Sequence, residues 1–379
     1  MAKLDKDYQL LLEDILNNGH LKENRTGVDT LSVFGRTIRH HMKDGFPLLT
    51  LKKMAWKTIR TELMWFLRGD TDIRFLLKHN CHIWDGDVYR VYSNYVNQEW
   101  ESGYINELFE DGLITEASND ETNINYKKLT KDEFINKIKT DDEFAKQWGS
   151  LGPIYGKQWR AWGGEMIPGI FDYIETPEKF ADEDEADFGI DQIQKLIDTL
   201  RTNPDSRRML VSAWNVSDLD KMTLPPCHYG FTVYTRKLSL EERANIYFKR
   251  NPGWTLQFKD SFFDGHSIPS REISLIWKQR STDAPLGFPF NIASYGLLLL
   301  MLADEVGMVP GEVIGHLEDT HIYVNQIDAI KQLIKLDADK YELPTVKIND
   351  GIYTSLLSDS EVVLENYQSH PKIFIPLSN

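Results

Sequence analysis

The first third of the chain alternates between helical and strand periodicity. An apolar stripe at helical spacing over residues 10–16 predicts a first helix that ends near residues 17–19. Residues 30–39 have the pattern of a strand around Gly35. Residues 56–67 form a strongly apolar helical pattern that nevertheless contains Glu62. A charge inside an apolar helix is unusual, so Glu62 is a candidate for chemistry.

The second half mixes strands and helices without regular alternation. Helices are expected at residues 190–200, 292–306 and 323–336. Strands are expected at residues 208–214, 231–234, 254–258 and 273–277. Because the order lacks repeated strand–helix–strand units, the sequence predicts an α+β fold.

Three stretches look like additions to a compact domain. Residues 86–150 are acidic and tyrosine-rich, and a capping box at Thr130 and Glu133 predicts at least one helix there. Residues 238–273 are polar, with a Pro-Gly turn at 252–253. Residues 172–191 form an acidic loop whose run 182–185 is expected to be a solvated face. We therefore expect a single catalytic domain over residues 1–379 that carries these additions.

The formal net charge of −15 is concentrated in two of these stretches. Residues 87–148 hold 14 acids against 7 bases, and residues 172–191 hold 9 acids against 1 base. The rest of the chain is formally neutral, so it can serve an anionic ligand. Nothing suggests a non-specific nucleic-acid binder, which needs excess positive charge.

The cysteine content and the N-terminus predict a soluble intracellular protein. The two cysteines imply no disulfide framework. The first residues lack the apolar segment of a signal peptide, and no apolar run is long enough to cross a membrane. We expect the cytoplasm, or the host cytoplasm for a viral protein.

Cys227, in the sequence Leu-Pro-Pro-Cys-His, is a candidate nucleophile. A nearby arginine would lower the pKa of its thiol and raise its reactivity. A buried structural cysteine is the alternative. Cys81 lies between His79 and His82, but these three residues cannot all point one way, so a metal site there is not expected.

Several arginines could hold a phosphate. Arg207 and Arg208 are adjacent and are expected to enter a strand with opposite orientations. Arg25 and the pair Arg280-Ser281 are further candidates, because guanidinium groups bind phosphate through two hydrogen bonds. Each alone could be a surface ion pair, but together they suggest a bound phosphomonoester.

Asn291 could read a pyrimidine ring. Its planar amide offers an acceptor and two donors, which matches the alternating carbonyl and N–H groups of a uracil edge. The alternative is a helix N-cap, because an apolar helix is expected to follow it.

At these positions the sequence resembles the folate-dependent thymidylate synthase family. The matching stretches occur in family order along the whole chain: residues 24–27, 44–48, 62–71, 83–85, 152–160, 203–208, 212–215, 226–228, 279–283, 287–295 and 319–323. The resemblance implies dUMP as substrate, 5,10-methylenetetrahydrofolate as co-substrate, no metal, and a homodimer with a large sheet at its interface. It implies no membrane and no nucleic-acid partner.

The resemblance also implies residue roles. Cys227 would add to C6 of the pyrimidine, Tyr155 would assist removal of the C5 proton, and Glu62 would organise water and protons. The nucleotide would be bound by Arg25, Gln279, Arg280, Ser281, Asn291, His321 and Tyr323, with Arg207 and Arg208 supplied by the partner subunit. The folate would be bound by Asp283, Lys52, Trp84, Leu224, Leu286 and Gly287.

The sequence departs from the family pattern near the folate site. An insertion follows Trp84, Thr282 and Ala284-Pro285 are unusual there, and the chain ends in the polar Ser378-Asn379. A wetter site would let water add to the methylene intermediate. Trp84, which should shield the methylene from water, is nevertheless present, so the favoured product is dTMP, with 5-hydroxymethyl-dUMP as the alternative. A non-catalytic nucleotide- or RNA-binding regulator is disfavoured, because Cys227, Tyr155, Glu62 and Asn291 are all present.

Overall fold

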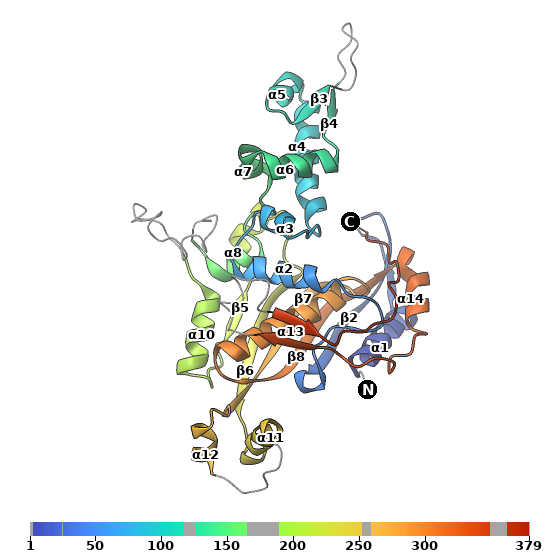
Figure 1. Cartoon of the computed structure of the whole chain (residues 1–379). Coiled ribbons are helices and arrows are strands. Elements are labelled where there is room, and N and C mark those ends of the chain that lie inside the picture. The colour runs from blue at the N-terminus through green and yellow to red at the C-terminus, as the bar shows by residue number, and fades with distance from the viewer. Residues whose placement is uncertain are drawn as a thin grey trace, which may run out of the picture. The chain divides into compact units, whose positions relative to one another are not determined.

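The computed structural model describes residues 3–24, 26–116, 126–164, 189–251, 259–348 and 362–378 (Figure 1). Arg25, the acidic run 182–185, the expected turn at 252–253 and the expected strand at 254–258 lie outside these residues. The chain forms two compact units, which we call the sheet unit and the helical unit. The sheet unit comprises Met1–Leu63, Asp191–Ala213 and Cys227–Asn379, and the helical unit comprises Met64–Ile190 and Trp214–Pro226. The single-domain prediction stays a prediction.

The sheet unit contains a six-stranded mixed sheet. Its strands are β1 (His20–Lys22), β2 (Thr30–His41), β5 (Leu210–Ser212), β6 (His228–Lys237), β7 (Arg271–Asp283) and β8 (Val309–Tyr323), in the spatial order β1-β2-β8-β7-β6-β5. A two-stranded sheet pairs β9 (Thr345–Ile348) with β10 (Val362–Glu365). The helices are α1 (Lys3–Asn18), α10 (Gln192–Thr202), α11 (Leu240–Arg250), α12 (Asp260–Gly265), α13 (Gly287–Glu305) and α14 (Ile327–Leu333). Single 3₁₀ turns occur at Met42–Asp44 and Val324–Gln326.

Helix α13 is the core of this unit. It connects β7 to β8, which pair in parallel, and packs on both strands (Figure 1). By length and composition it could cross a membrane, but most of it is buried inside the protein. Its apolar character is therefore that of a core helix. On β7 the buried side chains alternate, so Trp277 and Gln279 share the face that holds Ile273 and Leu275.

The helical unit contains α3 (Arg74–Lys78), α4 (Asp85–Glu101), α5 (Ile105–Glu110), α6 (Lys131–Thr140), α7 (Asp142–Trp148) and α8 (Tyr155–Arg160). It also holds the hairpin β3 (Ile114–Glu116) with β4 (Tyr126–Lys128), and a 3₁₀ segment at Val216–Lys221. Helix α2 (Trp56–Leu67) contains the boundary between the units. Residues 85–148, here called the first insertion, pack around Tyr92, Phe134, Phe144 and Trp148. The predicted capping box at Thr130 and Glu133 is present and begins α6.

The second insertion is a helical pair between β6 and β7. A capping box at Ser239 begins α11, and Tyr247, Phe263 and Ile268 form a small core. Arg243 is buried in this core and donates to Asp260 and Asp264 and to the carbonyl of Ile268. The expected range 238–273 therefore ends too late, because residues 271–273 already pair within β7.

Two further boundaries differ from expectation. The strand expected at residues 208–214 is reduced to β5, so Arg207 and Arg208 lie in the segment before it. The helix expected from Tyr323 begins later, because Tyr323 is the last residue of β8 and pairs with Thr30 of β2. The bounds predicted for α2 are confirmed.

Candidate active site

The register of three neighbouring strands gathers most of the predicted residues of the sheet unit. Gln279 of β7 is opposite His228 of β6, and on the other side Asp283 of β7 is opposite His321 of β8. Ser281 pairs with Asp319 in the same way. The backbone N–H of Arg280 donates to the carbonyl of Cys227 at 2.9 Å. Cys227 and residues 279–283 therefore lie beside each other at one end of the sheet.

Cys227 lies directly before β6, and its thiol is half-buried and forms no disulfide. The imidazole of the next residue, His228, contacts the hydroxyl of Tyr295 at 2.9 Å through Nδ1. Burial lowers the pKa of His228 to about 3, so its ring is neutral at physiological pH. His228 therefore supplies no positive charge to the neighbouring thiol.

Asn291 lies inside α13, beyond its first turn, because this helix begins at Gly287 with Leu286 as its N-cap. The N-cap alternative for Asn291 is therefore wrong. Its Nδ2 donates to Oε1 of Gln279 at 2.9 Å. Two amides that the sequence suggested separately thus form one hydrogen-bonded pair.

Asp283 is held in a buried polar cluster. The backbone N–H of Leu286 donates to its Oδ1 at 3.0 Å, and Nε2 of Gln326 donates to its Oδ2 at 3.3 Å. Burial raises the pKa of Asp283. Lys52 is also buried, and its ammonium group donates to the carbonyl of Pro285. Burial lowers the pKa of Lys52 to about 8, an effect opposed by the charge of Asp283.

His321 and Tyr323 lie at the C-terminal end of β8. Their rings meet edge to face, with centroids 5.4 Å apart. Nδ1 of His321 lies 3.2 Å from Oδ1 of Asp319, and this hydrogen bond is the main cause of the lowered pKa of Asp319. The Asp319 carboxylate also accepts from Ser32 at 2.7 Å and pairs with Lys22. His321 is therefore held by a carboxylate on its own strand.

Glu62, Arg207 and Arg208 are further predicted site residues in the sheet unit. Glu62 is only 7% exposed, and its charge contributes to the raised pKa of Tyr295, whose main cause is burial. Arg207 and Arg208 are exposed between α10 and β5. Their expected placement within a strand is wrong, because pairing with β6 begins only at Leu210.

The remaining predicted residues belong to the helical unit. Tyr155 is the first residue of α8 and is 2% exposed. Its ring lies 4.6 Å from that of Phe66 and 6.3 Å from that of Trp84, between centroids. Gly156 permits this approach, since a Cβ there would lie 2.6 Å from the Phe66 carbonyl oxygen. Leu224 is half-buried in the segment after Val216–Lys221.

The histidines on either side of Cys81 contact protein groups. His79 contacts the carbonyl of Phe75 through Nδ1 at 2.8 Å, and His82 contacts Asp85 at 2.8 Å. Among the residues that the structure describes, no group of three or more His, Cys, Asp or Glu side chains could hold a metal ion.

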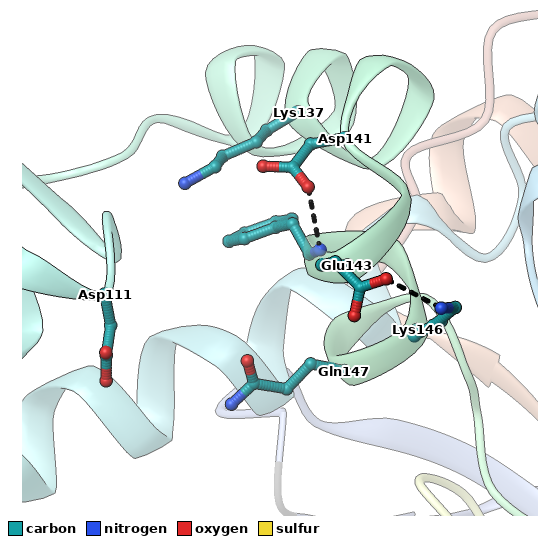
Figure 2. A pocket seen from close by; sticks show the side chains of 7 residues that line it. Asp111, Lys137, Asp141, Glu143, Lys146 and Gln147 are labelled. Atoms are coloured by element: carbon teal, nitrogen blue, oxygen red, sulfur yellow. Dashed lines mark hydrogen bonds and ion pairs between the residues drawn. The ribbon is translucent and has the colours of Figure 1, made fainter.

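A cavity of about 460 Å³ lies in the first insertion (Figure 2). Figure 2 shows Asp141 bonded to the N–H of Phe144 and Glu143 bonded to Lys146, with Asp111 across the opening. Lys137 also lines it, but its ammonium already donates to the carbonyl of Gly112 at 2.8 Å. None of the predicted site residues lines this cavity.

Sequence reasoning missed three residues that hold the site. Tyr295 contacts His228, Gln326 contacts Asp283, and Trp277 donates to Gln279 at 3.0 Å. The residue spacing between Trp277 and Gln279 could have indicated a shared strand face. The other two contacts join segments distant in sequence and left no local signal.

The half-buried thiol of Cys227, which forms no disulfide, therefore lies near two amides that are hydrogen-bonded to each other. The family model described as thymidylate synthase matches residues 6–379. The thymidylate synthase of Mycoplasma genitalium is 35% identical over 370 residues, which cover 97% of this chain and 98% of that protein. The chain belongs to the thymidylate synthase family.

The predictions of family, α+β fold and enzyme class are confirmed. The chain is a methyltransferase of this family, whose members use a methylenetetrahydrofolate co-substrate, bind dUMP and are generally dimeric. Nothing in these comparisons favours a hydroxymethylase.

Proposed function

We propose that this enzyme methylates dUMP at C5 to give dTMP, with dihydrofolate as the second product. The observation that carries the proposal is the Cys227–Gln279–Asn291 arrangement: a thiol directly before β6, whose residue is bonded through its carbonyl to Arg280, and a hydrogen-bonded amide pair that includes the neighbouring Gln279. When bound, 5,10-methylenetetrahydrofolate supplies the one-carbon unit and the hydride that reduces it to a methyl group. Family membership agrees with this reaction.

In the proposed mechanism Cys227 is the nucleophile. Its thiolate adds to C6 of dUMP, which moves the C5–C6 electron pair onto C5 and makes that carbon nucleophilic. After C5 has formed its new bond to the one-carbon unit, its proton leaves, and the electron pair expels the folate nitrogen. Hydride then arrives at the exocyclic methylene, and the thiolate leaves C6. Cys227 is therefore regenerated in each turnover.

Tyr155 and Glu62 are proposed to manage protons. Tyr155 is buried at the start of α8, where its hydroxyl would assist removal of the C5 proton. Glu62 is buried in an apolar helix, where it would organise water and stabilise charge at O4 of the pyrimidine. A dry environment strengthens both effects, because a low dielectric enlarges each charge interaction.

Substrate recognition is proposed to use neutral amides for the base and cations for the phosphate. Asn291 and Gln279 would read the uracil edge, while His321 and Tyr323 would bind the sugar 3′-hydroxyl. Arg25, Arg280 and Ser281 would hold the phosphate, together with Arg207 and Arg208 of a second subunit. The exposure of the last two is consistent with donation to a partner.

The folate side is proposed to be formed by Asp283, Trp84, Leu224, Leu286 and Gly287, with Lys52 toward the tail. The Asp283 carboxylate is a hydrogen-bond acceptor of the kind that a pterin ring with N–H donors requires. Its fixed position, held by Leu286 and Gln326, fits that role. The absence of a metal and a cytoplasmic location remain parts of this proposal.

Product analysis tests the proposed function. The full-length protein is incubated with dUMP and 5,10-methylenetetrahydrofolate, and the products are identified by mass spectrometry and by dihydrofolate absorbance. We expect dTMP and dihydrofolate in equal amounts, and neither when dUMP or folate is omitted. A nucleotide heavier than dTMP by one oxygen, formed with tetrahydrofolate, would contradict the proposal and identify a hydroxymethylase.

A further inference from the structure

We propose that Trp277 is a specificity-determining positioning residue. Its indole N–H fixes the orientation of the Gln279 amide, and this in turn fixes the positions of the oxygen and nitrogen atoms of the Asn291 amide that bind the base. The inference rests on the proposed function in one respect, namely that Asn291 reads the pyrimidine.

The orientation of the Gln279 amide follows from two partners whose chemistry is unambiguous. The indole Nε1 of Trp277 can only donate, and it lies 3.0 Å from Oε1 of Gln279. The carbonyl oxygen of Ser281 can only accept, and it lies 3.0 Å from Nε2 of Gln279. An inverted Gln279 amide would place donor against donor at Trp277 and acceptor against acceptor at Ser281. Both contacts therefore select one orientation.

The orientation of Asn291 follows from that of Gln279. Because Oε1 of Gln279 accepts, the atom of Asn291 that faces it at 2.9 Å must be the donor Nδ2. One Nδ2 hydrogen of Asn291 is thus used within the protein. Its Oδ1 and the second Nδ2 hydrogen are left in a fixed order for a ligand.

This fixed order distinguishes uracil from cytosine. Uracil presents a donor at N3 and an acceptor at O4, whereas cytosine presents an acceptor at N3 and a donor amino group at C4. Binding cytosine would require the inverted Asn291 amide, and inversion would oppose its Oδ1 to Oε1 of Gln279. Gln279 could follow only by breaking its bonds to Trp277 and Ser281. Discrimination against cytosine therefore depends on the indole of Trp277, which acts through Gln279 and Asn291 rather than by contact with the base.

The indole is firmly built into the core. Trp277 is fully buried and stacks on Tyr295 with ring centroids 5.4 Å apart and planes within 7°. Gly315 of β8 makes room for it, since a Cβ there would lie 2.5 Å from the indole ring. Trp277 and Gln279 are two residues apart on one strand and share a face. The N–H donor is therefore held rigidly in front of Oε1.

Two variants remove the donor. Trp277→Phe keeps an aromatic ring against Tyr295, and benzothienylalanine incorporated at position 277 keeps the bicyclic shape while replacing N–H by sulfur. Trp148→Phe is the matched control, because its indole N–H is buried without a hydrogen-bond partner in the described structure. Affinities of the full-length proteins for dUMP and dCMP are measured by isothermal titration calorimetry, and thermal midpoints are measured alongside.

We expect the preference for dUMP over dCMP to fall about three- to tenfold in both position-277 variants, the worth of one hydrogen bond between neutral groups. The control should keep the wild-type preference within about twofold. Unchanged preference in a folded position-277 variant would overturn the inference. So would failure of both variants to fold, because the hydrogen bond would then serve stability rather than selection.

The binding ratio also separates this inference from the proposed function. Wild-type protein that prefers dUMP but forms no dTMP would contradict the proposed reaction and leave the ratio test in force. Wild-type protein without a preference for dUMP would overturn the reading role of Asn291, and with it the inference.

Discussion

The strand ends of the sheet unit and the first insertion bury opposite kinds of side chain. At the strand ends, the polar side chains of Gln279 and His321 are buried and that of Asp283 is half-buried. They are hydrogen-bonded to Ser281, Asp319 and Leu286 respectively. In the first insertion the buried side chains are mainly apolar and include aromatic rings such as Tyr92 and Phe134, whose centroids lie 4.8 Å apart. Its capping box and its lysine–glutamate pair lie at the surface.

This difference separates stability from chemistry. Burying a polar group costs free energy unless every donor and acceptor is satisfied. This cost applies at the strand ends. Burial disfavours the charged forms of Asp283 and Lys52 there and thereby shifts their pKa values. The first insertion gains the packing energy of its rings and contains none of the predicted site residues. Changes in the two regions should therefore affect different measurements.

The largest expected effect distinguishes Cys227 from Cys81. Cys227→Ser should lower the turnover of dUMP by about 10,000-fold or more, because the nucleophile is lost. Steady-state assays of dTMP formation measure this. Cys81→Ala is the control: Cys81 is buried in the helical unit, so we expect near-normal turnover. Full turnover by Cys227→Ser would refute the assignment of the nucleophile.

The next effect concerns the insertion's aromatic core. Phe134 is fully buried among Tyr89, Tyr92 and Phe144. Phe134→Ala should lower the free energy of unfolding of this region by about 3–5 kcal/mol, because it leaves a cavity. Urea unfolding followed by tryptophan fluorescence measures this change.

The dUMP affinity of the Phe134→Ala variant should stay within about threefold of wild type. The half-exposed Phe109 supplies the control, since Phe109→Ala should change stability by less than about 1 kcal/mol. A hundredfold loss of dUMP affinity in folded Phe134→Ala would show that the first insertion supports the site after all.

A smaller effect is expected at the exposed arginines. Arg207→Ala and Arg208→Ala should each weaken dUMP binding about 10- to 100-fold, the range for a charge-assisted hydrogen bond. Calorimetric titration with dUMP measures it. Arg201→Ala is the matched control, because Arg201 is nearby in sequence but pairs with Glu305 at 2.5 Å.

Mixed dimers extend the arginine test. A Cys227→Ser subunit combined with an Arg207→Ala subunit should recover part of the activity if arginines are shared across the interface. Mixed dimers that stay as inactive as the two parents would count against a shared site.

The smallest effect is a pH dependence of stability. The pKa of Lys52 falls from 10.5 in a free side chain to about 8 in the protein. Between these values the unfolded chain binds more protons than the folded one, so stability rises with pH. Relative to Lys52→Met, the wild type should gain about 1–2 kcal/mol between pH 8 and pH 10. Urea unfolding at several pH values measures this, and equal slopes for both proteins would disprove the buried charge.

Local signals in the sequence predicted local structure well. The apolar period and the bounds of α2 are confirmed, as is the capping box of α6. The helix expected from residue 292 begins earlier, at Gly287. Since α13 begins at Gly287, Pro289 falls in the first turn, where no backbone N–H is needed. Asn291 thereby moves from the helix end into the helix body.

Tertiary pairing explains what the sequence pattern could not predict. Tyr323 stays in a strand because β8 continues to pair with β2 up to Thr30. The partners of the site, such as Gln326 beside Asp283, come from segments that only the folded chain brings together. Sequence motifs therefore predicted the candidate reactive side chains, whereas the residues that hydrogen-bond to them could be identified only from the folded structure.

The order of strands in the sheet has a consequence for synthesis of the chain. Strand β2 is synthesised early but pairs with β8, whose last residue is Tyr323. This pairing can therefore form only after most of the chain has been synthesised. The first insertion makes mainly local contacts and can fold as soon as it emerges. In nascent chains arrested before residue 309, β2 can pair with β1 but its other edge still lacks β8, and we expect a chaperone to bind at that edge.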